Sequence, residues 1–315
     1  MKLKKAMIVL GILVGSTISF ATDFSFTNEI KRNDESNYRN GSNDGKIKDE
    51  WTIGRGYYKI NDNLKLKFDV DRDIVNYDND SKNYTGWDTY FGLERNLPSF
   101  EMLNRKVSNK VSLDYYWDYI AKSYSKEDEI GLSLTSSLKP TKKTNASLKI
   151  WARNVNRNTS SENKTRLIKG LEGRFSWAIV PQLKYSATLK GYWGGYEDGA
   201  GTFTGSSSFT GSNIDASMFL IYNKSIYKEN NLNIKFRTIA GIEWFNMSRA
   251  RKRAGKDYNK SYLKPGIVIE YKLADNLKIY GDAEYTVMGN YSTYSSTRNR
   301  ECNEFEPTIG FSYKF

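Results

Sequence analysis

Apolar and polar side chains alternate along most of this chain, as in the stretch from Leu64 to Val70, where every second residue is apolar. Because successive side chains of a β-strand point to opposite faces, this alternation predicts strands with one apolar and one polar face. We predict fourteen strands, at residues 23–31, 48–60, 64–74, 84–96, 108–120, 128–138, 145–155, 165–179, 182–196, 213–227, 231–245, 261–273, 276–289 and 304–315. Alternation is less regular in 48–60 and 213–227, so the facing of those two strands stays open.

The final strand has the most regular pattern. Its apolar or aromatic positions are Phe305, Pro307, Ile309, Phe311, Tyr313 and Phe315, and the residues between them are polar or small. Such a strand with a terminal Phe resembles the closing strand of bacterial outer-membrane β-barrels. The resemblance implies that Phe311, Tyr313 and Phe315 form an assembly signal for the barrel assembly machinery. A strand of an ordinary sandwich is the alternative.

The breaks between strands alternate in length. Short turns are expected at 61–63, 139–144, 180–181, 229–230 and 274–276, and longer polar breaks at 32–47, 75–83, 156–164, 197–212, 246–260 and 291–303. Two breaks do not fit, because 97–107 is long where a turn is expected and 121–127 is short where a loop is expected. Sorting by length favours an all-β transmembrane up-and-down antiparallel barrel, with short periplasmic turns, long external loops and both ends on the periplasmic side.

Residues 1–21 have the features of a secretory signal peptide. Lys2, Lys4 and Lys5 precede an apolar segment at 6–14, and Ser19-Phe20-Ala21 is a small-x-small cleavage site. An apolar core of about ten residues is too short to span a membrane as a helix. We therefore expect a signal peptide at 1–21 and a single outer-membrane barrel at 22–315.

The composition agrees with a barrel that has a lipid-facing outside and a wet inside. Mean hydropathy is low, at −0.67, yet the chain contains 23 Tyr, 15 Phe and 7 Trp. Disordered polar chains lack this aromatic content. In a membrane barrel, half of each strand is apolar, half is polar, and aromatic residues form belts at the two interfaces.

Histidine is absent, and Cys302 is the single cysteine. Nucleophile–histidine catalysis, histidine metal sites and an internal disulfide are thereby excluded. We expect no enzyme activity, no metal and no cofactor.

Ile269–Thr286 followed by Pro307–Phe315 is similar to the last strands of the OmpG-type monomeric porins, and the whole pattern is more loosely similar to the KdgM-type oligogalacturonate porins. The resemblance implies a monomer in the outer membrane through which ions and small hydrophilic solutes diffuse passively. The pH gate of OmpG-type channels uses a histidine pair, which this chain lacks, so we expect no histidine-driven closure.

If the apolar sets face lipid, the interleaved charged residues line the pore. The predicted basic lining residues, on the seventh to twelfth strands, are Lys149, Arg153, Arg166, Arg174, Lys184, Lys190, Lys235, Arg237, Lys264 and Lys272. The predicted acidic lining residues, on the third to fifth strands, are Asp69, Asp71, Asp73, Asp88, Glu94, Asp114 and Asp118. Two opposed arcs of charge would set up a field across the pore. Mutual neutralisation between neighbouring strands is the alternative.

Two predicted external loops have distinct compositions. One carries a dense run of basic residues: Arg249, Arg251, Lys252, Arg253 and Lys256. It is either a solvated loop, a mouth that attracts anions, or a contact for lipopolysaccharide phosphates. The other, 197–212, is rich in Gly, Ser and Thr, and either extends outside the barrel or folds inward to narrow the pore.

The net charge of the chain limits the classes of binding partner that we expect. The formal charge is +12, and removal of the three signal lysines leaves +9, from 45 basic and 36 acidic residues. We expect outer-membrane lipid, lipopolysaccharide and small solutes or ions as partners, and no nucleic acid.

The leading hypothesis is a porin with a weak anion preference. The alternatives are a channel selective for acidic oligosaccharides and an adhesive or structural barrel; an autotransporter translocator is disfavoured because no passenger precedes the first strand.

Overall fold

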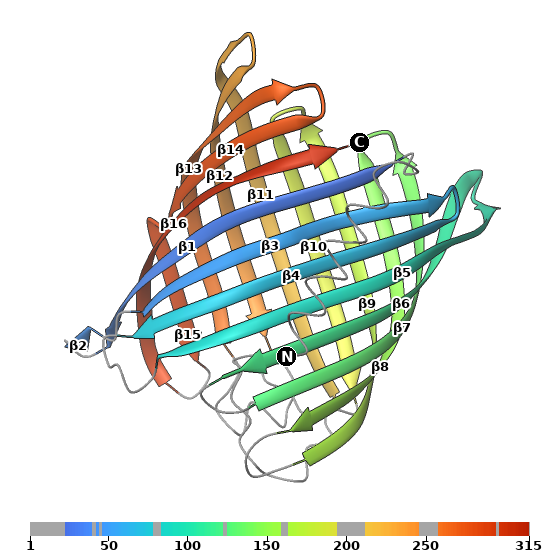
Figure 1. Cartoon of the computed structure of the whole chain (residues 1–315), viewed down its shortest axis with the longest axis horizontal. Coiled ribbons are helices and arrows are strands. Elements are labelled where there is room, and N and C mark those ends of the chain that lie inside the picture. Colours follow the sequence, from blue (N-terminus) through green and yellow to red (C-terminus); the bar gives the residue numbers. More distant parts are fainter. Residues whose placement is uncertain are drawn as a thin grey trace.

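Antiparallel strands close into one barrel in the computed structural model, which describes residues 23–39, 42–43, 46–77, 83–121, 125–158, 163–193, 212–245, 258–293 and 296–314 (Figure 1). The strands are β1 (Phe24–Arg39), β2 (Ser42–Asn43), β3 (Lys46–Asn61), β4 (Leu64–Tyr77), β5 (Tyr84–Met102), β6 (Arg105–Ile120), β7 (Ser125–Thr141), β8 (Thr144–Asn158), β9 (Asn163–Val180), β10 (Leu183–Trp193), β11 (Ser212–Glu229), β12 (Leu232–Phe245), β13 (Tyr258–Ala274), β14 (Leu277–Tyr285), β15 (Met288–Thr293) and β16 (Ser296–Lys314). The described part of the chain has no helix long and apolar enough to cross a membrane.

These elements form a barrel of fourteen strands. The two residues of β2 pair only with the end of β1, and β14 and β15 follow one another between β13 and β16. The barrel closes where β1 pairs with β16, with Phe26 opposite Tyr313 and Lys31 opposite Thr308. Figure 1 shows these first and last strands, in blue and red, side by side. The predicted fold class and the number of strands are confirmed.

All the turns at one rim are short. Two-residue connections join six successive pairs of strands, at 62–63, 103–104, 142–143, 181–182, 230–231 and 275–276. Leu103 and Asn104 both have positive φ, 52° and 57°, as a type I′ hairpin requires. Asp23 and Lys314, at the two ends of the described chain, lie at this rim: Lys59 N donates to Asp23 O at 2.9 Å and Lys314 N donates to Asn276 O at 2.8 Å.

The expectation of a long break at 97–107 is wrong. Strand β5 continues to Met102, and its pairing with β6 shifts between Leu97 and Phe100. Pro98 lies in this irregularity, where a missing N–H does not interrupt the ladder. This connection is therefore as short as the others at its rim, and the sorting of turn lengths has no exception there.

The polarity of the barrel is the reverse of that of a soluble protein. Large apolar side chains are on the outside, with Ile309 63% exposed and Leu132 58% exposed. Charged side chains are covered inside, with Asp114 5% exposed and Glu304 3% exposed. An apolar band this extensive is stable only against lipid, and a closed barrel leaves no strand edge unpaired there.

Aromatic rings cover one another on the outer face near the short-turn rim. Phe24 and Phe68 are stacked with ring centroids 6.4 Å apart, and Phe26 lies 6.0 Å from Phe311 across the closing pair of strands. Tyr58 and Tyr313 pack against the same cluster. Such a group of rings at one level is typical of the interfacial belt of a membrane barrel.

Candidate functional site: the inner face of the barrel

The inner face can be followed from strand to strand, because residues opposite one another in an antiparallel pair point to the same side. Starting from the covered Asp114, the register places all seven predicted acidic residues on this face. It also places nine of the ten predicted basic residues there. The exception is Arg166, whose side chain lies outside the described residues.

The acidic arc is interleaved with basic side chains that the sequence reading did not select. Arg55 Nε lies 2.6 Å from Asp69 Oδ2, and Arg55 Nη2 lies 3.5 Å from Asp71 Oδ2. Its other nitrogen, Nη1, is 3.0 Å from Glu29 Oε1 of β1. The Arg55 guanidinium thus bridges carboxylates on the strands to either side of β3.

Two further sets of ion pairs neutralise this arc. Lys48 Nζ lies 2.8 Å from Asp73 Oδ2. Lys67 and Lys110 both contact Glu94 Oε2, at 2.7 Å and 2.8 Å. These carboxylates, which we predicted from the sequence to act together as one arc of negative charge, therefore face cations on the adjacent strands.

Three more acidic residues of the predicted lining lie on the same arc. Asp114 accepts hydrogen bonds from Tyr90 Oη at 2.8 Å and from Ser112 Oγ at 2.5 Å. Asp88 and Asp118 are directly opposite one another on β5 and β6. Like groups face each other in this part of the arc, because Asp88 is also opposite Asp71 of β4 and Asp118 is also opposite Glu127 of β7.

A bulge explains why Arg55 and Lys48 were missed. The pairing of β3 with β4 shifts between Thr52 and Gly54, so even-numbered side chains point inward before the bulge and odd-numbered ones after it. Residues 48–60 therefore lose the regular period of two. A change of phase at Ile53 is the signal that would have placed both cations on the inner face.

The basic arc is neutralised in the same way. Arg153 Nη1 lies 3.0 Å from Glu129 Oε2, and Arg237 Nε lies 2.5 Å from Glu284 Oε1. Arg174 pairs with Glu172, and Lys235 pairs with Glu270. These contacts favour mutual neutralisation between neighbouring strands over two opposed fields.

The remaining predicted cations are distributed along the wall. Lys149 is opposite Glu172 of β9, and Lys190 is opposite both Glu172 and Asp215. Lys184 and Lys272 lie on the inner face near the short-turn rim, and Lys272 is opposite Lys278.

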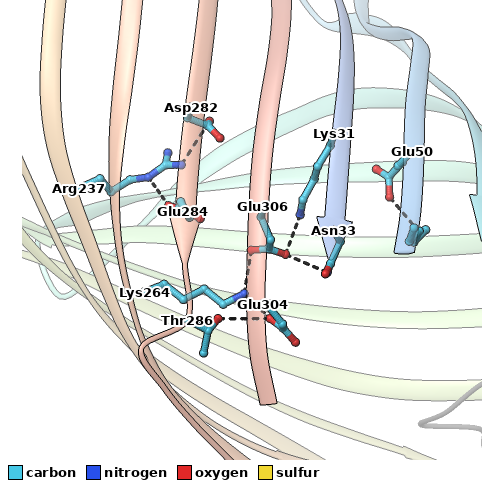
Figure 2. Close-up of polar contacts among 11 residues, drawn as sticks. Lys31, Asn33, Glu50, Arg237, Lys264, Asp282, Glu284, Thr286, Glu304 and Glu306 are labelled. Atoms are coloured by element: carbon cyan, nitrogen blue, oxygen red, sulfur yellow. Dashed lines mark hydrogen bonds and ion pairs between the residues drawn. The ribbon is translucent and has the colours of Figure 1, made fainter. Parts of the chain in front are cut away.

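A buried network joins the two ends of the barrel sequence. Lys264 Nζ lies 2.8 Å from both Glu304 Oε2 and Glu306 Oε2 of β16. Glu306 Oε1 also contacts Lys31 Nζ at 3.3 Å and accepts a hydrogen bond from Asn33 Nδ2 at 3.1 Å, both on β1. Figure 2 shows Lys264 reaching from β13 toward both glutamates.

The network lies beside the interruption between β14 and β15. Thr286 N donates to Glu304 O at 2.8 Å, and Thr286 Oγ1 donates to Glu304 Oε2 at 3.5 Å (Figure 2). Glu304 thus holds Thr286, the first residue of the interruption, through both its backbone and its side chain. Sequence reasoning selected Lys264 but neither glutamate, although both lie on the predicted strand 304–315, because the acidic lining residues were selected on the third to fifth strands alone.

A cation–aromatic band crosses the inner face from β5 to β10; we define it as Tyr90, Tyr116, Trp151, Arg153, Lys190 and Tyr192. Arg153 Cζ lies 4.8 Å from the Tyr116 ring centroid and 5.1 Å from that of Trp151. Lys190 Nζ lies 5.5 Å from the Trp151 centroid and 4.7 Å from that of Tyr192. The rings of Tyr90 and Tyr116 are 4.7 Å apart. Sequence reasoning found the two cations but not the rings between them.

Several sequence predictions fall outside the described residues. These are the signal peptide at 1–21, the basic loop with Arg249, Arg251, Lys252, Arg253 and Lys256, nearly all of 197–212, and Phe315. Of the predicted assembly signal, Phe311 is 39% exposed on the outer face, and Tyr313 is paired with Phe26 and Leu277. No group of side chains suited to a metal ion occurs among the described residues.

The apolar outside and the charged inside define the class of this protein: a membrane-spanning β-barrel with a polar interior. The chain matches no family model, and no curated protein is significantly similar to it.

Several solved structures are similar to the barrel at low identity. The TodX monoaromatic hydrocarbon channel (deltaS2 mutant) of Pseudomonas putida is 8% identical, with 96% of this chain and 94% of that chain covered and a TM-score of 0.46. The β domain of the Bordetella autotransporter Brka is 9% identical, with 93% and 99% covered and a TM-score of 0.43. The outer-membrane channel DcaP of Acinetobacter baumannii is 9% identical, with 94% and 97% covered and a TM-score of 0.43.

Proposed function

We propose that the protein is a channel of the bacterial outer membrane through which ions and small hydrophilic solutes diffuse passively, as a monomer. The observation that carries the proposal is the charged inner face inside an apolar outer face. Charges enclosed by lipid are stable only when they are paired or in contact with water. A water-filled lumen lined by many short-range ion pairs meets this requirement.

The distribution of ion pairs supports weak ion selectivity. Strong selectivity arises where charges of one sign form a ring around the path of the ion. Here the acidic arc contains Arg55, Lys48 and Lys67, and the basic arc contains Glu129 and Glu172. The excess positive charge of the whole chain favours a slight preference for anions.

Planar-bilayer recording of the refolded protein tests the proposal. A folded, heat-modifiable barrel should produce discrete conductance steps in KCl, with a small reversal potential of anion-selective sign in a KCl gradient. Folded protein that inserts without conducting would overturn the channel and favour the adhesive or structural alternative. Light scattering of the detergent complex should give the mass of one chain.

A further inference from the structure

The cation–aromatic band places a buried indole ring on the inner face of the barrel. Trp151 is only 7% exposed, although it projects from the inner face. Arg153 Cζ and Lys190 Nζ both lie over its ring, 5.1 Å and 5.5 Å from the ring centroid. Aromatic faces attract cations, so the indole fixes two positive charges on the wall instead of leaving them on mobile side chains.

The wall beneath the band is shaped to bring these rings close. A Cβ at Gly170 would lie 2.6 Å from Trp151 Cζ2, and a Cβ at Gly92 would lie 2.1 Å from Tyr90 Oη. Glycine at these two positions lets the side chains lie flat against the strands. The band is therefore a built feature of the wall and not a chance proximity of long side chains.

The carboxylates next to the band make contacts of their own. Glu172 pairs with Arg174, and Asp215 accepts a hydrogen bond from Tyr192 Oη at 3.1 Å. Glu129 contacts Arg153 through Nη1 only, and a guanidinium has further donors on its other nitrogens. The positive ends of Arg153 and Lys190 thus remain suited to a second anion that arrives through the lumen.

Resting on the channel function proposed above, we propose that this band is a transient binding site for solutes that carry a carboxylate on a ring with an apolar face. The carboxylate contacts Arg153 and Lys190, and the ring of the solute stacks on the half-buried Tyr116 or Tyr192. Two sources share this chemistry, the aromatic acids and the uronic sugars. Trp151 is a positioning residue, because it holds the two cations and is itself covered.

Single-channel recording in KCl with added benzoate or glucuronate tests this site. Either anion should interrupt the current in a concentration-dependent way, whereas benzyl alcohol and glucose at the same concentrations should not. A response to benzoate alone assigns the site to aromatic acids, and a response to glucuronate alone assigns it to uronic sugars. Open channels that ignore both anions would overturn the site and leave the channel function standing; absence of any conductance would overturn the channel function instead.

Matched variants separate a built site from general charge. Lys190→Gln should weaken the block about fivefold or more, because a charge-assisted contact is lost. Lys184→Gln, on the same face of the same strand, removes the same charge six residues away and should change the block less than about twofold. Equal losses in the two variants would overturn the site.

Substitutions at Trp151 test the positioning role without changing the charge of the wall. Trp151→Leu keeps both cations but removes the ring, so it should weaken the block while leaving the reversal potential unchanged. Trp151→Phe should restore most of the block, because it returns an aromatic face. If Trp151→Leu binds as tightly as wild type, or if Phe gives no recovery in a folded barrel, the positioning role is wrong.

Discussion

At the scale of single residues, the buried ion pairs of Lys264 stabilise the inner face. Lys264 is 8% exposed and contacts two carboxylates that are also buried, so its charge is compensated within the wall. Removing one partner of a buried ion pair leaves an uncompensated charge, which costs more than the pair contributes.

We therefore predict that Lys264→Met destabilises the barrel by about 3 kcal/mol. Lys31→Met is the matched control, because its side chain is 40% exposed and it contacts the same Glu306; it should cost less than about 1 kcal/mol. Urea unfolding in detergent, followed by heat-modifiable migration, measures both. Similar urea midpoints for the two variants would contradict the claim that Lys264 stabilises the barrel more than Lys31 because it is buried.

A second residue-scale prediction concerns the turn between β3 and β4, outside the membrane-spanning part. Lys59 Nζ lies 2.9 Å from Asp62 Oδ1, and this hydrogen bond holds the pKa of Asp62 below its usual range. A carboxyl whose pKa is lowered by folding stabilises the folded state above its unfolded pKa, and this contribution disappears as the pH falls through the lower folded value. Carbon-13 NMR titration should give a lower midpoint for Asp62 than in Lys59→Gln; identical midpoints would exclude the pair in solution.

At the scale of elements, period-two alternation located all fourteen strands, because each strand has one face in lipid and one in the interior. It cut some of them short, since β1 continues to Arg39 and β16 begins at Ser296, within the breaks predicted at 32–47 and 291–303. It failed where the period is broken. Pro98 read as a loop residue although it lies in a bulge of β5, and the bulge at Thr52–Gly54 reversed the phase of β3 and hid Arg55. Bulges add one residue to one strand, so their position depends on the partner strand and cannot be read from local periodicity.

A prediction at the scale of elements concerns Gly56, where β1 and β3 approach each other closely. A Cβ at Gly56 would lie 1.9 Å from Ser25 O, so Gly56→Ala must separate the backbones of β1 and β3. A Cβ at Gly173 would lie 3.9 Å from Leu189 O, which is an ordinary contact distance. We expect Gly56→Ala to lose at least about 2 kcal/mol of stability or to refold in low yield, and Gly173→Ala to behave like wild type. Refolding yield and urea midpoint measure this, and a fully stable Gly56→Ala would contradict the observed close approach.

At the scale of the whole molecule, the sequence indicated which residues are charged and on which strand, but not which of them meet. Pairing between strands depends on register, and register brought Lys264 to Glu306 across 42 positions of sequence. The two charged arcs predicted from the sequence are therefore, in the structure, a set of ion pairs between neighbouring strands. A field survives only where like charges face each other, and Asp88 and Asp118 are such a pair, directly opposite on β5 and β6.

The selectivity of the pore should respond to that pair and not to charge elsewhere. We predict that Asp88→Asn combined with Asp118→Asn shifts the reversal potential in a KCl gradient further toward anions, because it removes negative charge that faces the lumen. Asp128→Asn is the control: its carboxylate accepts a hydrogen bond from Tyr115 Oη on the outer face, so its loss should leave the reversal potential unchanged. A shift of equal size in both variants would mean that ions respond to total charge and not to the face on which it lies. The assignment of the inner face as the conducting surface would then be wrong, because lipid-side and lumen-side carboxylates would be equivalent to the permeating ion.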